Sequence, residues 1–80
     1  MFAGDLESAI LVSMRRFGRA VTVTELADYV GASKTAVRDR LHVMRDHREA
    51  WVIAKGNPAR WVLSMWGRDI ARNRRWERPE

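Results

Sequence analysis

The stretch that decides the fold is TELADYVGASKTAVRDRL, residues 24–41. It contains two helix-forming segments separated by a very short turn. Gly31 is expected to end the first segment with a positive φ angle, and Ser33 is a favourable N-cap for the second. Since only Ala32 separates these two residues, the helices must cross at a steep angle. Two helices joined in this way form a helix-turn-helix.

Local signals define both helices. Thr22 and Glu25 have the spacing of a capping box, in which the threonine oxygen caps one amide and the glutamate reaches back to another. The first helix should therefore run over about residues 23–30. The second helix carries three apolar residues on one stripe at helical spacing: Val37, Leu41 and Met44. This stripe is expected to face the core.

An earlier helix is predicted over residues 5–17, where the apolar residues Leu6, Ile10, Met14 and Phe17 recur at helical spacing. Gly18 is a natural stop for this helix, and the arginines of its last turn complement the helix dipole. Residues 19–22 are short and β-branched, so they are expected to form an edge strand before the helix-turn-helix begins.

The pattern changes after the helix-turn-helix to WVIAKGNPARWVLS, residues 51–64. Two β-rich runs flank a loop that contains Gly, Asn and Pro, which predicts a hairpin with a long connection. Trp51 and Trp61 lie on opposite strands and are expected to be cross-strand or core neighbours.

The chain then continues as MWGRDIARNRRWERPE, residues 65–80, with five arginines among its last 13 residues. A terminal helix that frays after Arg75 would place Trp66, Ile70, Asn73 and Trp76 on one face. We expect this face to dock on the domain or on a second copy of the chain.

Composition narrows the class of partner. Eighty residues suit one small domain, and a formal net charge of +5, with 13 arginines among 15 cations, suits a phosphate-rich partner. The absence of cysteine excludes disulfides and thiolate metal sites. No apolar run approaches the length of a membrane span and no charged-then-apolar leader is present, so we expect a cytoplasmic protein without a membrane partner.

Helix, short strand, helix-turn-helix and hairpin is the element order of a winged helix. The stretch 24–41 resembles the helix-turn-helix of bacterial and archaeal winged-helix transcription regulators, and 51–64 resembles their wing. The resemblance implies an α+β, mainly helical fold: a winged-helix domain over residues 1–64, followed by an arginine-rich helix or basic tail over 65–80. One departure stands out: the segment 46–50, where such regulators usually have a glycine before the wing, contains none.

The resemblance implies sequence-specific binding to double-stranded DNA by a small, repressor-like regulator of prokaryotic or viral origin, associated with the nucleoid. The recognition helix, over about residues 33–46, would enter the major groove. Arg38 is the first candidate for a bidentate guanine contact, while Asp39 either accepts from cytosine or steers a neighbouring arginine. The candidate DNA-binding residues on this helix are Ser33, Lys34, Thr35, Arg38, Asp39, His42 and Arg45.

The wing and the tail offer further candidate contacts. The wing residues Lys55, Asn57 and Arg60 are placed to touch the DNA backbone. The tail arginines Arg68, Arg72, Arg74 and Arg75 either follow phosphates or keep a docked helix soluble. A homodimer through helix 1 and the C-terminal segment is a further candidate, although dimeric regulators of this family carry longer flanking helices.

Two other functions stay open beside the leading one. The winged helix could serve as a protein interaction module, such as a viral factor that binds a host protein, or as an excision-type or architectural factor that bends DNA. Catalysis is not expected: the two histidines, His42 and His47, have no cysteine or convergent carboxylates to complete a metal or nucleophile site, so no cofactor is implied.

Overall fold

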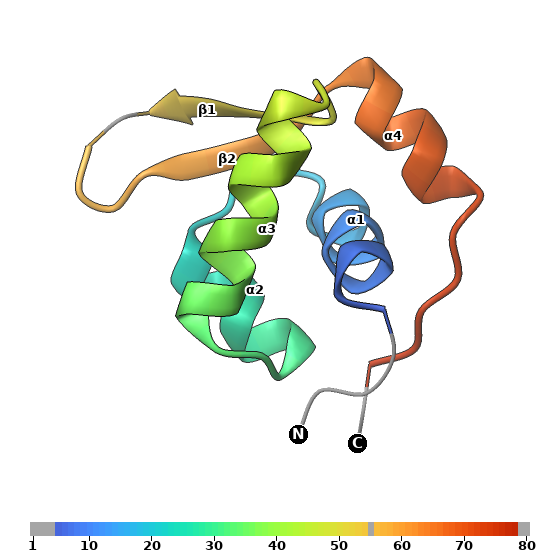
Figure 1. Cartoon of the computed structure of the whole chain (residues 1–80), viewed down its shortest axis with the longest axis horizontal. Coiled ribbons are helices and arrows are strands. Elements are labelled where there is room, and N and C mark those ends of the chain that lie inside the picture. Colours follow the sequence, from blue (N-terminus) through green and yellow to red (C-terminus); the bar gives the residue numbers. More distant parts are fainter. Residues whose placement is uncertain (1–4, 55, 79–80) are drawn as a thin grey trace.

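The computed structural model describes residues 5–54 and 56–78, which form four helices and one antiparallel hairpin. In chain order the elements are α1 (Leu6–Phe17), α2 (Val23–Val30), α3 (Lys34–Asp46), β1 (Ala50–Ala54), β2 (Arg60–Leu63) and α4 (Met65–Arg72). Figure 1 shows α1 seen nearly end-on, with α3 on one side of it and α4 on the other, while the hairpin projects away from the helices. This arrangement confirms the predicted winged helix.

The helix-turn-helix forms through the predicted local signals. The Thr22 hydroxyl accepts from the amide of Glu25 at 3.1 Å, and the Glu25 carboxylate accepts from the amide of Thr22 at 3.0 Å. Gly31 ends α2 with a φ of 78°, and Ser33 caps α3 by accepting from the amide of Ala36. The capping box, the turn glycine and the N-cap are all confirmed.

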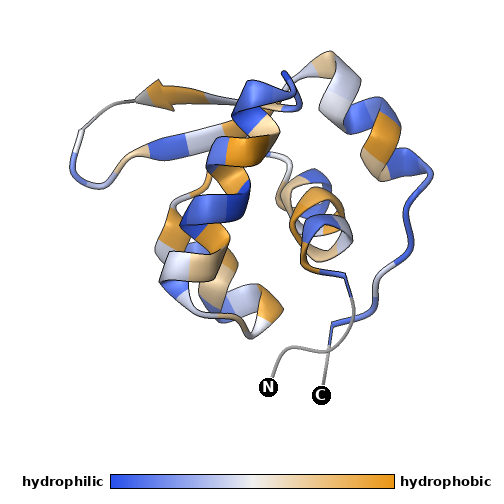
Figure 2. Ribbon diagram, viewed as in Figure 1, coloured by the Kyte–Doolittle hydropathy of each residue, from blue (hydrophilic) through white to orange (hydrophobic). Residues whose placement is uncertain are grey.

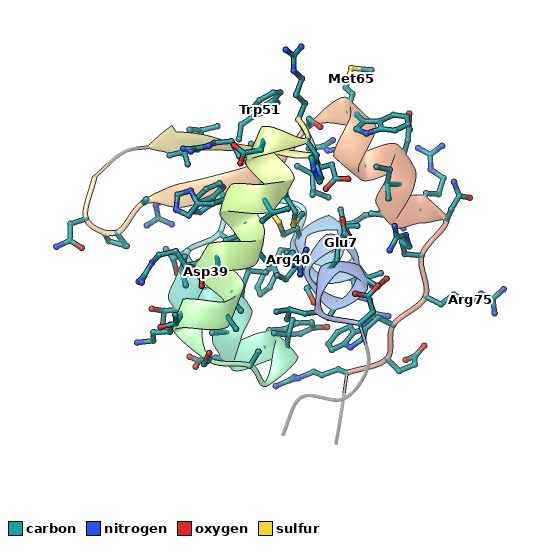
Figure 3. All side chains as sticks on the ribbon, in the orientation of Figure 1. Glu7, Asp39, Arg40, Trp51, Met65 and Arg75 are labelled. Carbon is teal, nitrogen blue, oxygen red and sulfur yellow. The ribbon has the colours of Figure 1, made fainter. Side chains whose placement is uncertain are left out.

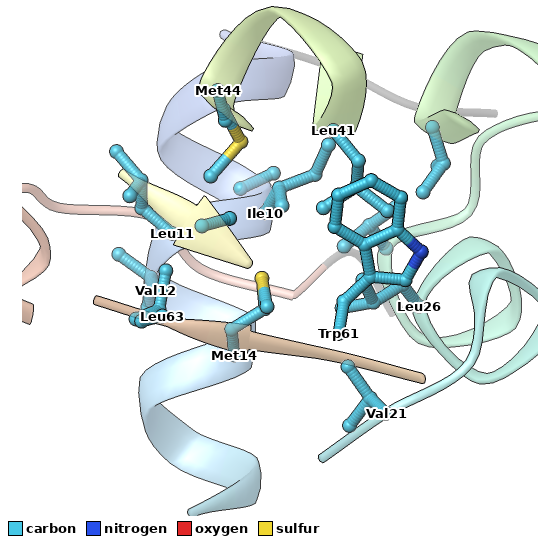
Figure 4. Close-up of a cluster of buried hydrophobic side chains, with 14 of the residues drawn as sticks. Ile10, Leu11, Val12, Met14, Val21, Leu26, Leu41, Met44, Trp61 and Leu63 are labelled. Carbon is cyan, nitrogen blue, oxygen red and sulfur yellow. The ribbon is translucent and has the colours of Figure 1, made fainter. Parts of the chain in front are cut away.

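A single cluster of buried apolar side chains joins α1, α2, α3 and the hairpin (Figure 4). The α3 stripe of Val37, Leu41 and Met44 is fully buried in this cluster. The colouring in Figure 2 shows the apolar residues of α3 interleaved with hydrophilic ones along the helix. Burial of this stripe therefore determines which side of α3 is exposed to solvent.

The hairpin follows the predicted order, but its register separates the two tryptophans. Val52 pairs with Trp61, and Trp51 pairs with Val62. Because neighbouring side chains on a strand point to opposite faces, Trp61 is buried at 3% exposure while Trp51 is 42% exposed. The expectation that Trp51 and Trp61 are cross-strand or core neighbours is therefore wrong, and only Trp61 belongs to the core.

The strand predicted over residues 19–22 is reduced to one residue. Val21 exchanges two backbone hydrogen bonds with Trp61, of 2.9 and 2.8 Å, as an isolated bridge. Pairing stops there because the next residue, Thr22, already serves as the N-cap of α2.

The terminal helix is shorter than predicted, and a different face of it docks. It ends at Arg72, and it buries the small residues Gly67 and Ala71 while Trp66 stays 59% exposed. A methyl group added at Gly67 would overlap the carbonyl oxygen of Glu49, so this glycine allows a close approach that no larger residue permits. Trp76 reaches the core from the extended segment that follows α4. The prediction had placed it on a continuation of the helix instead.

Candidate nucleic-acid interface

Helix α3 presents a polar face to solvent. Every predicted recognition residue within this helix is exposed: Lys34, Thr35, Arg38, Asp39, His42 and Arg45. Lys34, Arg38 and His42 follow one another at intervals of four residues, so they form a single stripe along the helix. Ser33 is also exposed, but its hydroxyl is engaged in capping the helix.

The exit from α3 lacks a glycine, and an arginine takes its place. Arg48 has a φ of 61°, in the left-handed region where glycine is usual. The amide of Arg48 donates to the carbonyl of Arg45, and the amide of Glu49 donates to the carbonyl of Met44 at 2.8 Å. These two bonds form a Schellman motif, so α3 ends cleanly without glycine.

Ser64 joins this exit to the other elements. Its hydroxyl donates to the carbonyl of Arg48 at 2.6 Å and accepts from the amide of Gly67 at 2.9 Å. Its amide donates to the carbonyl of Glu49. One serine thus connects the end of α3, the end of the hairpin and the start of α4, which fixes the recognition helix relative to the wing.

A groove of about 400 Å³ separates α3 from the wing. From α3 it is lined by Lys34, Arg38 and His42, and from the wing tip by Asn57. Within the part of the chain that the structure describes, the side chains of Lys34 and Arg38 make no hydrogen bond or ion pair. Their charged groups are therefore available to an anionic or hydrogen-bonding ligand.

Trp61 and Thr24 are among the groove residues that were not predicted from the sequence. Trp61 forms one wall and meets the His42 ring edge to face, with centroids 5.4 Å apart. Thr24 enters from the first turn of α2. Thr24 follows the N-cap of α2, so the sequence did place it at the start of that helix. The sequence could not show that this start faces the groove, because that depends on how α2 and α3 cross.

The remaining predicted residues do not converge on the groove. Asp39 lies on the other flank of α3, in a shallow hollow with Leu6 and Arg40 (Figure 3). Arg60 is exposed and precedes Trp61 on β2, so its side chain points to the opposite face of the hairpin. Lys55, the third wing residue predicted, lies outside the described residues.

The tail arginines divide into two kinds. Arg74 is partly buried and donates to the Ser8 hydroxyl at 2.9 Å and to the Asp5 carboxylate at 3.4 Å, so it fastens the tail to α1. Arg68, Arg72 and Arg75 are exposed. Figure 3 shows Arg75 pointing away from the body of the molecule. All four lie across α1 from the recognition helix (Figure 1).

The carboxyl groups of Glu25, in the first turn of α2, and Glu49, at the exit of α3, have pKa values shifted in opposite directions. The Arg19 guanidinium, 2.7 Å from Glu25, and the amide of Thr22 lower the pKa of Glu25 to about 2. Burial raises the pKa of the Glu49 carboxyl, and the neighbouring Glu7 carboxylate raises it further. The capping box at α2 is thus stable in its charged form, whereas the exit of α3 favours a neutral Glu49.

The described residues contain no group of three or more His, Asp or Glu side chains that could hold a metal ion. Within the same ranges, every helix falls short of the length and apolar character needed to cross a membrane.

Comparison with known proteins identifies the fold. No family model matches the sequence, and no curated protein is significantly similar to it. Among solved structures, ZitR from Lactococcus lactis is 19% identical with a TM-score of 0.71, over 82% of this chain and 51% of that one. AF1382 from Archaeoglobus fulgidus is 17% identical with a TM-score of 0.74, over 82% of this chain and 76% of that one.

A third similar structure is the Zalpha domain of PKZ from Carassius auratus, solved in complex with Z-DNA. It is 16% identical with a TM-score of 0.62, over 72% of this chain and 92% of the domain. All three have winged-helix folds. The present chain spans about half the length of ZitR, the first of these relatives.

Proposed function

We propose that this chain binds double-stranded DNA through α3 and the wing, as a small repressor-like transcriptional regulator acting on the nucleoid of a prokaryote or on viral DNA. The observation that carries the proposal is the stripe of Lys34, Arg38 and His42, exposed and facing a groove that the wing closes on its other side. Such a helix presents its side chains to base edges when it enters a major groove.

The residues of this stripe have separate roles in the proposal. Arg38 donates both arms of its guanidinium to guanine O6 and N7, a contact that contributes about 1 to 3 kcal/mol of discrimination. Lys34 and the amides at the N-terminus of α3 bind a phosphate. His42 is held against Trp61, so its position is fixed, and Asn57 touches the backbone from the wing tip.

Three other exposed residues of α3 are expected to contribute less to DNA binding. Thr35 and Arg45 are exposed beside the stripe and lie within reach of phosphates once the helix is seated. Asp39 faces the other flank, which favours a steering role on a neighbouring arginine over a contact to cytosine. The Zalpha domain's complex with Z-DNA supports nucleic acid as the ligand class for this fold.

The test is a binding titration of purified protein against short DNA duplexes over a range of salt concentrations. We expect the logarithm of affinity to fall linearly with that of salt concentration, with a slope of several counterions. Arg38→Ala should weaken sequence preference more than overall affinity, whereas Lys34→Ala should weaken all duplexes alike and reduce the slope by about one.

Arg40→Ala is the matched control, since Arg40 lies on α3 but outside the groove. Absence of duplex binding at low salt would refute the proposal, as would equal losses in Arg38→Ala and Arg40→Ala. A Z-form duplex included as competitor shows which helical form is preferred.

A second candidate function, binding of a protein partner, is supported by a different surface. Beyond the groove, the exposed large apolar side chains of the described residues are Val43 on α3 and a further group of Trp51, Ile53, Met65 and Trp66. Figure 3 places Trp51 and Met65 at the same end of the molecule.

A homodimer through the predicted elements would use Met65 and Trp66, because residues 8–14 of α1 are buried within the chain. Sedimentation of the wild type and of Trp66→Ser tests this homodimer. A wild-type dimer that dissociates in Trp66→Ser would support it.

A further inference from the structure

A second basic surface lies on the side of α1 away from the recognition helix. Two adjoining hollows, of about 330 and 260 Å³, run between α1 and the C-terminal segment. They share the lining residues Arg15 and Arg72, so they are adjacent, and together they are called here the arginine groove. Seven arginines line it and Glu77 is its only lining carboxylate among the described residues.

Three of these arginines are held in place by the fold. Arg16 donates to the carbonyl of Trp76 at 3.2 Å and lies over the indole ring, 5.9 Å from its centroid. Arg74 is bound to Ser8 and Asp5, and Arg19 to Glu25. These contacts fix the walls of the groove and neutralise only part of its charge.

The others are free to bind a ligand. Arg15, Arg68 and Arg75 are exposed and make no hydrogen bond or ion pair within residues 5–54 and 56–78. Arg72 has only a 3.9 Å pairing with Asp69, in which both side chains are more than 60% exposed. An exposed pair of this kind contributes little, so Arg72 can exchange Asp69 for another anion.

The chemistry of the groove favours a chain of phosphates. Guanidinium groups bind phosphate with two parallel hydrogen bonds, and here they are distributed along a depression instead of converging on one point. Among the apolar residues that line it, Val12, Met14, Leu63, Ala71 and Trp76 are buried and Val62 is only partly exposed, so the groove offers little apolar surface for insertion into a membrane. A second copy of the chain would set arginine against arginine, which disfavours self-association at this surface.

We propose that the arginine groove binds the phosphate backbone of a second DNA segment, so that one chain bridges two duplexes. The inference rests on the proposed binding of the first duplex by α3 and the wing. Because α1 packs between α3 and α4, the two surfaces face different directions, and a straight duplex seated on α3 leaves the groove unoccupied (Figure 1).

The experiment is a bridging assay, in which protein on a bead-bound mixed-sequence DNA duplex captures a second, fluorescent duplex. The groove variant is Arg15→Gln with Arg75→Gln. The matched control is Arg40→Gln with Arg78→Gln, which removes the same charge from residues outside the groove. All four arginines are partly or fully exposed, and circular dichroism checks that each variant stays folded.

We expect the wild type and the control to capture the second duplex, and the groove variant to lose most of that capture. The salt slope for capture should fall by about two, one for each phosphate contact removed. Binding of the first duplex should stay within about twofold of the wild type at moderate salt, where exposed charges are largely screened.

Equal capture by the groove variant and the control would overturn the inference, because bridging would then come from a dimer with two recognition helices. If the wild type binds phosphatidylserine vesicles, and the groove variant loses this binding but still captures the second duplex, the groove would be a membrane-binding site. This result would also overturn the inference. Lys34→Ala separates the two proposals. If Lys34→Ala leaves first-duplex binding intact while the groove variant abolishes it, both the recognition-helix proposal and bridging fail, and the groove is a single DNA site. If Lys34→Ala weakens first-duplex binding while the groove variant still captures the second duplex, only the bridging inference fails.

Discussion

The groove between α3 and the wing, called here the recognition groove, and the arginine groove are both basic, but they are built in different ways. The recognition groove combines two free cations, a histidine, an asparagine and an aromatic wall, all placed by one helix and one hairpin. The arginine groove combines seven guanidinium groups from α1, the loop that follows it and the C-terminal segment, with almost no other hydrogen-bonding side chain. Varied donors and acceptors on a rigid helix can distinguish bases, whereas a row of like charges can only follow a backbone.

Among the substitutions that distinguish the two grooves, Trp76→Ala is expected to have the largest effect. The Trp76 side chain is 7% exposed and forms the floor of the arginine groove, so its removal should lower the free energy of unfolding by about 3 kcal/mol. Bridging should be lost, while binding through α3 should persist wherever the variant is folded. Urea denaturation measures the stability.

Trp66→Ala is the control for this change, because that tryptophan is 59% exposed and should alter stability by less than about 0.5 kcal/mol. Similar losses for the two variants would show that the tail does not anchor to the core as described.

Gly67→Ala tests the junction that both surfaces share. Replacement of a helical glycine by alanine ordinarily stabilises a protein by up to about 1 kcal/mol. Here the added methyl group would overlap the Glu49 carbonyl, so we expect a loss of about 2 kcal/mol and a displaced α4. A gain in stability on thermal unfolding would contradict the close approach of α4 to the exit of α3.

Glu49→Gln should give a smaller effect that depends on pH. The pKa of Glu49 is raised in the folded chain, so the folded state binds more protons than the unfolded state above the ordinary pKa of 4.5. Stability from this group is therefore full below pH 4.5 and is lost as pH rises through the raised pKa. Glu49→Gln should accordingly raise the thermal midpoint near neutral pH and leave it nearly unchanged at pH 4.

Glu25→Gln provides the comparison of opposite sign. The lowered pKa of Glu25, about 2, means that its contribution is present above pH 4.5 and is lost as pH falls toward 2. Removal of this carboxylate should therefore destabilise the chain at neutral pH. If both substitutions shifted the midpoint in the same direction at neutral pH, the assignment of the buried carboxyl at the exit of α3 would be wrong.

Local signals were enough to predict the helix-turn-helix from the sequence. The capping box at Thr22, the glycine at position 31 and the N-cap at Ser33 each depend on residues a few positions apart, and all were confirmed. The outward face of α3 followed from the same periodicity. The missing glycine after α3 was visible in the sequence, but the sequence did not show that Arg48 would take the left-handed conformation in its place.

The features that sequence reasoning missed depend on contacts between distant residues. The end of α4 could not be placed, since the helix docks through Gly67 against a carbonyl 18 positions earlier. Trp51 was assigned to the wrong face because the hairpin register was not known. The arginine groove joins Arg15 with Arg75, and from the sequence Arg15 has only the ordinary role of a cation in the last turn of a helix.

The most direct test of the central claim, that α3 reads DNA sequence, is selection of bound duplexes from a random library with the wild type and with Arg38→Ala. We predict that the wild type enriches a defined motif containing guanine, and that Arg38→Ala loses the preference for that guanine while still binding duplex. Enrichment of no motif by the wild type, or of the same complete motif by both proteins, would contradict it.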